Sequence, residues 1–148
     1  MKRKILIVED NVGLSQIQKD WLSRAGYDAV TAMSEPIARS LIRKTQFDLI
    51  LSDVRLPEGD GISLLEWLRK EKKDIPFIIT TEFVSVPDVV RTIKLGARDY
   101  LPKPVHREHL LELAEDVFHP VATVRKQERQ LFRRISPMIL KVEKFARL

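Results

Sequence analysis

The chain has 148 residues, of which 44% are hydrophobic and 32% are charged, so it can bury a core of one ordinary domain with an appendage. Its net charge of +5 is unevenly placed, because residues 119–148 hold eight Lys or Arg and two Asp or Glu, which leaves −1 on residues 1–118. The absence of cysteine excludes disulfides and thiolate metal sites and fits a reducing cytoplasm, and no apolar run is long enough to span a bilayer.

Short β-rich runs alternate with segments of helical periodicity along the chain. Strands are expected at residues 5–8, 27–31, 49–51, 76–80 and 99–101. Apolar residues recur at helical spacing within residues 14–22, 37–42, 64–68, 90–93 and 110–117. Ser34 with Pro36 is typical of a helix start, and Gly26 and Gly96 are typical of helix ends. The segment between the third strand and the next helix, residues 56–61, has the composition of a turn.

Five strands alternating with five helices predict an α/β fold with a five-stranded parallel sheet, doubly wound so that helices cover both faces. Ligands of such sheets lie beyond the carboxyl ends of the strands. Functional side chains are therefore expected where the strands end.

Three carboxylates are expected at the ends of two of these strands. Glu9 and Asp10 follow the first strand, and Asp53 follows the third. A single Asp at a strand end is usually a helix cap or a turn former, but three carboxylates packed together repel one another unless a cation joins them. Mg²⁺ with retained waters suits a site of this kind.

A hydroxyl and an ammonium follow the other two strand ends. Thr80 and Thr81 end the fourth strand, and Lys103 follows the fifth. Taken alone they would be strand residues and a surface lysine, but beside a Mg²⁺ cluster they make a pocket for a phosphoryl group, which a carboxylate can accept. Residues 9–13 read EDNVG, so the first strand lacks a G-x-G-x-x-G loop, and the chain has no P-loop motif, which disfavours nucleotide enzymes.

At this point the chain resembles the receiver domains of two-component response regulators, over residues 2–118. Residues 5–11 (ILIVEDN) resemble the first strand and acidic pair of that family, and residues 48–61 (DLILSDVRLPEGDG) resemble its phosphoacceptor block. Residues 76–81 (PFIITT) and 96–104 (GARDYLPKP) complete the set. The resemblance implies a flavodoxin-like sheet with strand order 2-1-3-4-5.

The resemblance also implies roles for individual residues. Asp53 would be the phosphoacceptor, Thr81 the switch hydroxyl, Tyr100 the switch aromatic and Lys103 the phosphate-binding lysine. The implied metal ligands are Glu9, Asp10, Asp53 and the backbone carbonyl of Arg55. The family often has a cis Lys–Pro bond, which points to Lys103–Pro104.

Two residues depart from the family pattern. Glu82 stands where a small residue usually follows the switch threonine, and its carboxylate would either slow phosphorylation or point outward. Phe83 is bulky enough to restrict an attacking water. These departures concern the lifetime of the phosphorylated form rather than its chemistry.

The tail is expected to be a helical extension. Its apolar seam steps by three and four along Val117, Val121, Val124, Glu128, Leu131 and Ile135. Such a seam favours a dimeric coiled coil over residues 119–135, with an amphipathic helix folded back on the domain as the alternative. The basic residues form a solvated face or, as an alternative, touch nucleic acid. Residues 136–148 open with Ser-Pro and resemble the start of the AAA+ domain of NtrC-type sigma-54-dependent activators.

The favoured function is therefore a cytoplasmic phosphoacceptor that takes a phosphoryl group from a sensor histidine kinase with Mg²⁺ and forms a homodimer. It would catalyse only its own phosphorylation and dephosphorylation, touch no membrane, and reach DNA only through an output domain beyond this chain. A stand-alone signalling adaptor with a basic tail is the main alternative. A small Mg²⁺-dependent phosphatase would need a second acid or base near Asp53, where only Val54, Arg55 and Leu56 follow.

Overall fold

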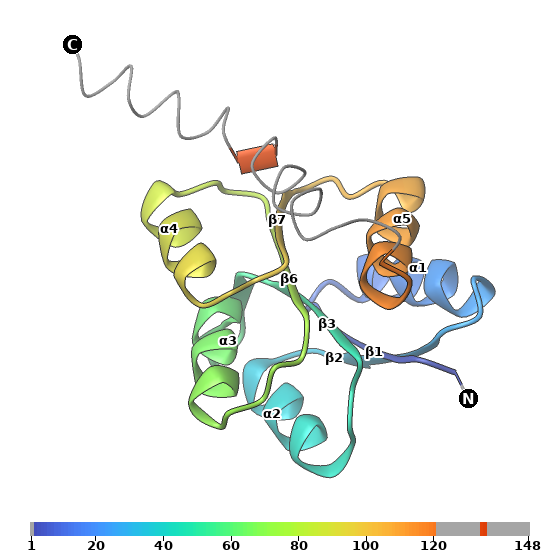
Figure 1. The fold of residues 1–148 in the computed structure, drawn as a ribbon, viewed down its shortest axis with the longest axis horizontal. Helices are drawn as coiled ribbons and strands as arrows, with labels where there is room; N and C mark the ends of the chain where they lie inside the picture. The colour runs from blue at the N-terminus through green and yellow to red at the C-terminus, as the bar shows by residue number, and fades with distance from the viewer. Residues whose placement is uncertain (1, 121–133, 136–148) are drawn as a thin grey trace.

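Five parallel strands form the central sheet in a computed structural model that describes residues 2–120 and 134–135. They are β1 (Lys4–Val8), β2 (Asp28–Ala32), β3 (Leu49–Asp53), β6 (Phe77–Thr81) and β7 (Asp99–Pro102). Their order is β2-β1-β3-β6-β7, and every neighbouring pair is parallel (Figure 1). The predicted sheet and its order are confirmed, since β6 and β7 are the predicted fourth and fifth strands.

Helices cover both faces of the sheet (Figure 1). One face carries α1 (Val12–Arg24) and α5 (Arg107–Phe118), and the other carries α2 (Glu35–Lys44), α3 (Gly61–Lys70) and α4 (Val86–Lys94). Successive strand residues point to opposite faces, so a strand buried on both sides must be apolar throughout. In β1, Ile5 and Ile7 join the α1–α5 core, whereas Leu6 and Val8 join the core under the other three helices.

The helix starts follow the capping signals in the sequence. Ser34 Oγ accepts a hydrogen bond from the Ile37 N–H at 3.4 Å, and Pro36 lies in the first turn of α2, as predicted. Asn11 Oδ1 accepts from the Leu14 N–H at 3.0 Å and so caps α1 directly after the acidic pair. The caps satisfy N–H groups that have no partner inside the helix, and they fix where each chain segment turns away from the carboxyl edge of the sheet.

The turn after β3 contains a structure that the sequence did not predict. Residues of β4 (Arg55–Leu56) and β5 (Gly59–Asp60) pair as a short antiparallel hairpin. The pattern showed only a turn, because two-residue strands are too short to give an alternating signal. This β4–β5 hairpin stands directly beside the end of β3.

The predicted linker and output segments lie largely outside the described residues, which exclude 121–133 and 136–148. Within this tail, residues 119–120 and 134–135 are described. Arg134 forms an ion pair with the Asp99 carboxylate, and Ile135 is 2% exposed within the core that contains Tyr100. Across the described ranges, no helix is both long and apolar enough to cross a membrane.

Candidate functional site

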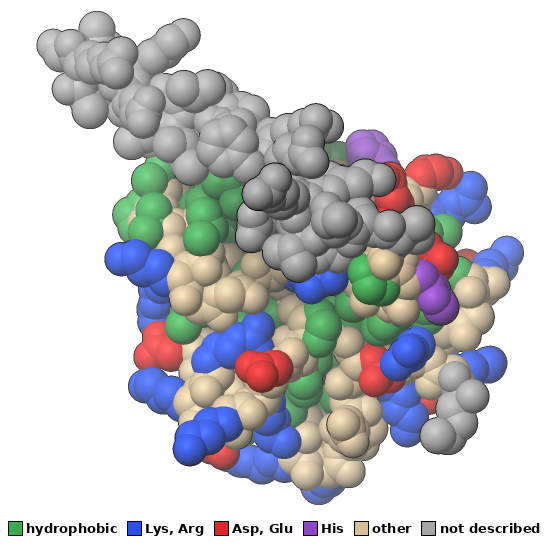
Figure 2. All heavy atoms as spheres, in the orientation of Figure 1, with side chains coloured by type: hydrophobic (Ala, Val, Ile, Leu, Met, Phe, Trp, Pro, Cys, Tyr) green, Lys and Arg blue, Asp and Glu red, His purple; other side chains and the backbone are tan. Residues whose placement is uncertain are grey.

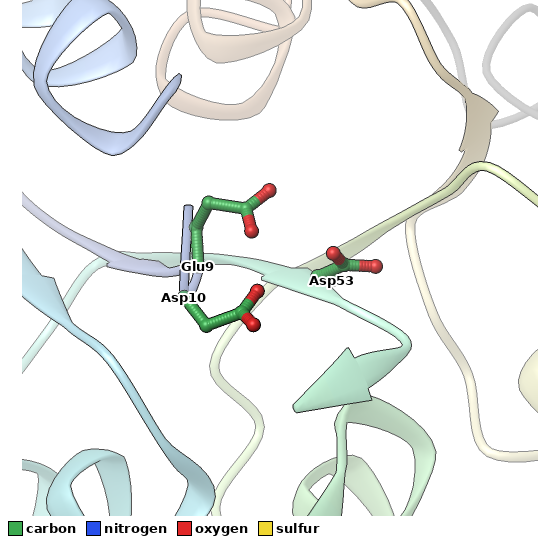
Figure 3. A group of neighbouring side chains, drawn as sticks. All are labelled: Glu9, Asp10 and Asp53. Carbon is green, nitrogen blue, oxygen red and sulfur yellow. The ribbon is translucent and has the colours of Figure 1, made fainter. Parts of the chain in front are cut away.

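Three carboxylates meet at the carboxyl edge of the sheet. Glu9 and Asp10 leave the end of β1, and Asp53 leaves the adjacent end of β3 (Figure 3). One carboxylate oxygen from each lies within 4.8 Å of the others. Glu9 and Asp53 are buried, whereas Asp10 is exposed. The structure thus brings together three residues predicted to converge from positions more than 40 residues apart.

Lys103 joins two of these carboxylates. Its Nζ donates to Glu9 Oε1 at 2.6 Å and to Asp53 Oδ2 at 2.8 Å, and its side chain is only 9% exposed. The Lys103 N–H is bonded to the Thr81 carbonyl at 2.8 Å, so β6 holds the lysine backbone in place. The peptide bond to Pro104 is cis, as the sequence predicted.

The electrostatics of the cluster explain its need for more positive charge. Burial lowers the pKa of Lys103, but the hydrogen bonds to Asp53 and Glu9 outweigh burial and leave the pKa above its ordinary value. Burial raises the pKa of Glu9 more than the Lys103 hydrogen bond lowers it. Three carboxylates against one ammonium leave a formal excess of negative charge, so oxygen ligands are available for a hard divalent cation.

Thr81 lies at the end of β6 with its side chain buried. Its hydroxyl accepts from the Phe83 N–H at 3.1 Å and donates to the Phe83 carbonyl at 3.0 Å. The neighbouring Thr80 hydroxyl donates instead to the Ser52 carbonyl on β3, at 3.5 Å. The Thr81 hydroxyl is therefore held by the loop after β6, and not by Asp53.

Tyr100 lies on β7 opposite Ile79 of β6 and is fully buried. Burial raises the pKa of its phenol more than the nearby Ser85 backbone and Thr81 side chain lower it. Neither group meets the distance and angle of a hydrogen bond, so the hydroxyl has no well-formed partner among the described residues. The family resemblance implied that Tyr100 is the switch aromatic. In this structure the ring already lies inside the core under α4.

Arg55 and Phe83 line the cavity around the carboxylates. The cavity measures about 320 Å³, and its lining comprises Glu9, Asp10, Asn11, Asp53, Arg55, Glu82, Phe83 and Lys103. The Arg55 guanidinium lies over the Phe83 ring, 4.4 Å from its centroid, and the Arg55 N–H donates to Asp53 Oδ1 at 3.3 Å. Sequence analysis named Arg55 only for its backbone carbonyl and Phe83 for its bulk, and it missed the contact between their side chains. Glu82 is exposed at the rim of the same cavity.

Comparison with protein families agrees with this geometry. The profile of the response regulator receiver domain matches residues 5–115. The chain belongs to this family. It is a receiver domain of a two-component response regulator, and its sheet order is that of the flavodoxin-like fold.

Curated relatives of this receiver domain are named as transcriptional regulatory proteins. GlrR of Escherichia coli is 31% identical over 145 residues, which cover 97% of this chain and 33% of GlrR. ZraR of Salmonella typhimurium is 40% identical over 114 residues, which cover 77% of this chain and 26% of ZraR. The chain therefore spans about a third or less of the length of these relatives.

Solved receiver domains share the fold. A CheY-like receiver domain protein from Methanospirillum hungatei superposes with a TM-score of 0.76 at 29% identity, covering 88% of this chain and 99% of that one. The non-phosphorylated HemR receiver domain from Leptospira biflexa gives a TM-score of 0.75 at 35% identity, covering 82% and 98%. The fold extends over nearly the whole of both solved chains.

Proposed function

We propose that this receiver domain accepts a phosphoryl group on Asp53 in a Mg²⁺-dependent reaction. The observation that carries the proposal is the Lys103 ammonium, which bridges the buried carboxylates of Asp53 and Glu9 at 2.8 and 2.6 Å. A carboxylate oxygen of Asp53 attacks phosphorus, and the bond from phosphorus to the donor's leaving group breaks as the acyl phosphate forms.

The residues present suit Mg²⁺, because a hard cation takes oxygen ligands from one or two carboxylates and keeps several waters. Glu9, Asp10 and Asp53 would hold it together with the backbone carbonyl of Arg55, which follows Asp53 by two residues. Bound there, the ion supplies charge neutralisation for the transferring phosphoryl oxygens.

The other site residues act on the product. Lys103 already contacts the accepting carboxylate, so its ammonium is placed to pair with a phosphoryl oxygen once Asp53 is modified. Thr81 would exchange its bonds to the Phe83 backbone for one to the phosphoryl group. Such an exchange moves the loop between β6 and α4 and so couples the site to Tyr100. The phosphoryl group favours one of two conformations of the domain that already exist in equilibrium.

The donor in this proposal is a sensor histidine kinase, and the output is regulation of transcription in the cytoplasm. The kinase reaches Asp53 through the open side of the cavity, where Asp10 and Glu82 are exposed. The names of GlrR and ZraR, which are transcriptional regulatory proteins, support this output. Both relatives are much longer than the matched segment, which fits an NtrC-type sigma-54-dependent activator whose DNA contacts lie outside this chain.

Homodimerisation forms part of the same proposal. Figure 2 shows apolar side chains gathered over α4, where Val90 and Ile93 are 41% and 43% exposed. Val84, in the loop before this helix, is 43% exposed. Adjacent apolar side chains left in water favour burial against another surface, and a second copy offers the same group in a two-fold arrangement.

Intact mass measured after incubation with acetyl phosphate and Mg²⁺ tests the proposal. We expect the wild type to gain one phosphoryl group and the Asp53→Asn variant to gain none. EDTA should abolish the gain in the wild type. Labelling that persists in the Asp53→Asn variant would place the acceptor elsewhere.

A further inference from the structure

Glu35 is a buried carboxylate that does not line the cavity. It begins α2, is 4% exposed, and has two partners. Glu35 Oε1 accepts from Arg39 Nε at 3.1 Å, one turn along the same helix. Glu35 Oε2 accepts from the backbone N–H of Asp60 at 2.8 Å. A buried charge is tolerated only when it is paired and hydrogen-bonded, so both contacts are needed to keep this carboxylate inside.

The Asp60 amide belongs to the β4–β5 hairpin. Within the hairpin, Asp60 pairs with Arg55 and Gly59 pairs with Leu56. A Cβ on Gly59 would lie 1.6 Å from Glu35 Oε2, so glycine leaves the space that the carboxylate fills. One side of the hairpin is thus built around the Glu35 side chain.

The other side of the hairpin rests on the end of β3. The Gly61 N–H donates to the Val54 carbonyl at 2.7 Å, and a Cβ on Gly61 would lie 2.1 Å from the Asp53 carbonyl oxygen. The Arg55 N–H donates to Asp53 Oδ1 at 3.3 Å. The hairpin is therefore clamped between the accepting aspartate and the carboxylate of Glu35.

We infer that Glu35 is a positioning residue for the metal site, acting through Asp60 on Arg55. The inference rests on the proposed function, in which the Arg55 carbonyl is a metal ligand. Glu35 fixes the Asp60 backbone, Asp60 is paired with Arg55, and so the carboxylate sets where the Arg55 carbonyl stands relative to Asp53. Groups that orient a ligand in this way change metal affinity without touching the metal.

Two conservative variants separate the reach of this side chain from its charge. Glu35→Asp keeps the negative charge but is one methylene short of the Asp60 amide. Glu35→Gln keeps the reach and an oxygen acceptor but loses the charge that pairs with Arg39. If positioning is the role, the Kd for Mg²⁺ rises about tenfold in Glu35→Asp and stays close to wild type in Glu35→Gln.

Isothermal titration with MgCl₂ measures these affinities, and urea unfolding of the same samples measures stability. Both variants should be less stable than wild type, because both disturb the buried pair with Arg39. A purely structural role would move stability in both and affinity in neither. Glu58→Gln is the matched control, since this exposed carboxylate at the tip of the same hairpin removes a charge without removing the acceptor for Asp60.

Three results would overturn the inference: wild-type affinity in Glu35→Asp, an equal loss in both Glu35 variants, or the same loss in Glu58→Gln. Gly59→Ala provides a second route if Glu35→Asp fails to fold, because the new methyl group displaces the Glu35 carboxylate from the other side. A Gly59→Ala variant that binds Mg²⁺ as tightly as wild type would also contradict the inference. If the wild type itself neither binds Mg²⁺ nor is labelled on Asp53, the proposed function fails, and this inference fails with it.

Discussion

Replacing Lys103 by Met tests whether the lysine neutralises the acidic cluster. The ammonium contacts both Glu9 and Asp53, and the three side chains are 9%, 3% and 10% exposed. Met has a similar length and no charge, so the variant keeps most of the packing and removes both ion pairs. Two buried carboxylates then face each other with no cation, and we expect the metal-free fold to be destabilised.

The size of the effect follows from the burial of the pair. Removing one partner of a buried ion pair costs roughly 3–5 kcal/mol. We expect the lower end, about 3 kcal/mol, because Glu9 can take up a proton to relieve part of the repulsion. For a chain of this size that corresponds to a fall in melting temperature of roughly 6–12 °C.

The pH dependence has a definite sign. Burial already raises the pKa of Glu9 above its ordinary value of 4.5, and the Lys103 hydrogen bond is what opposes that rise. In the variant the folded-state pKa rises further, so the folded state binds a proton that the unfolded state has lost. The deficit in stability is therefore larger at neutral pH than in mild acid, and it shrinks as the pH falls toward 4.5.

Urea unfolding in EDTA, at pH 7.5 and at pH 5, measures the deficit through tryptophan fluorescence. Lys94→Met is the control, because Lys94 is exposed at the end of α4 and should change stability by less than about 0.5 kcal/mol. Added Mg²⁺ should restore more stability to the Lys103 variant than to the wild type, by supplying the missing charge. A variant as stable as wild type at pH 7.5, or with the same deficit at both pH values, would refute the reasoning.

Four further outcomes are expected. Asp10→Asn should lose Mg²⁺ binding by titration yet melt no lower than wild type without metal, since it relieves repulsion. Tyr100→Phe should raise the unfolding free energy by about 1 kcal/mol, because it removes a buried hydroxyl with no partner among the described residues. Phe83→Ala should shorten the half-life of the phosphorylated form, followed by intact mass, because it opens the cavity to water. Sedimentation should show more self-association for the full chain than for one ending at Phe118.

The sheet was predictable because its strands are buried on both faces. The continuous apolar run at residues 5–8 is what a strand with helices on both sides requires, because its side chains enter two cores. Helix starts were predictable where a side chain caps the first turn, as Ser34 does. The β4–β5 hairpin was not predictable, since its strands are shorter than any periodic signal.

The candidate site was predictable to the extent that topology alone creates it. Parallel strands bring their carboxyl ends to one edge, and β1 and β3 are adjacent, so Glu9 and Asp53 had to be neighbours once the strand order was known. Lys103 follows β7, which β6 separates from β3, so it joins the cluster only through the reach of its long side chain. Contacts that long side chains make across loops follow from no pattern in the sequence. The stacking of Arg55 on Phe83 depends on rotamers that no spacing rule expresses.

The tail shows the limit of a spacing argument most clearly. A step of three and four residues says that one stripe of a helix is buried, but not which surface buries it. Ile135 fits that step, and in this single chain it is 2% exposed in the core that contains Tyr100, while Arg134 pairs with the buried Asp99. One side chain cannot fill the receiver core and a coiled-coil seam together. A coiled coil that includes Ile135 must therefore first separate Arg134 from Asp99, which leaves a buried carboxylate on β7 without its cation. The free energy gained by forming the predicted seam must therefore exceed the free energy of the Arg134–Asp99 ion pair. Breaking that pair would disturb β7, the strand that carries Tyr100 and leads directly to Lys103.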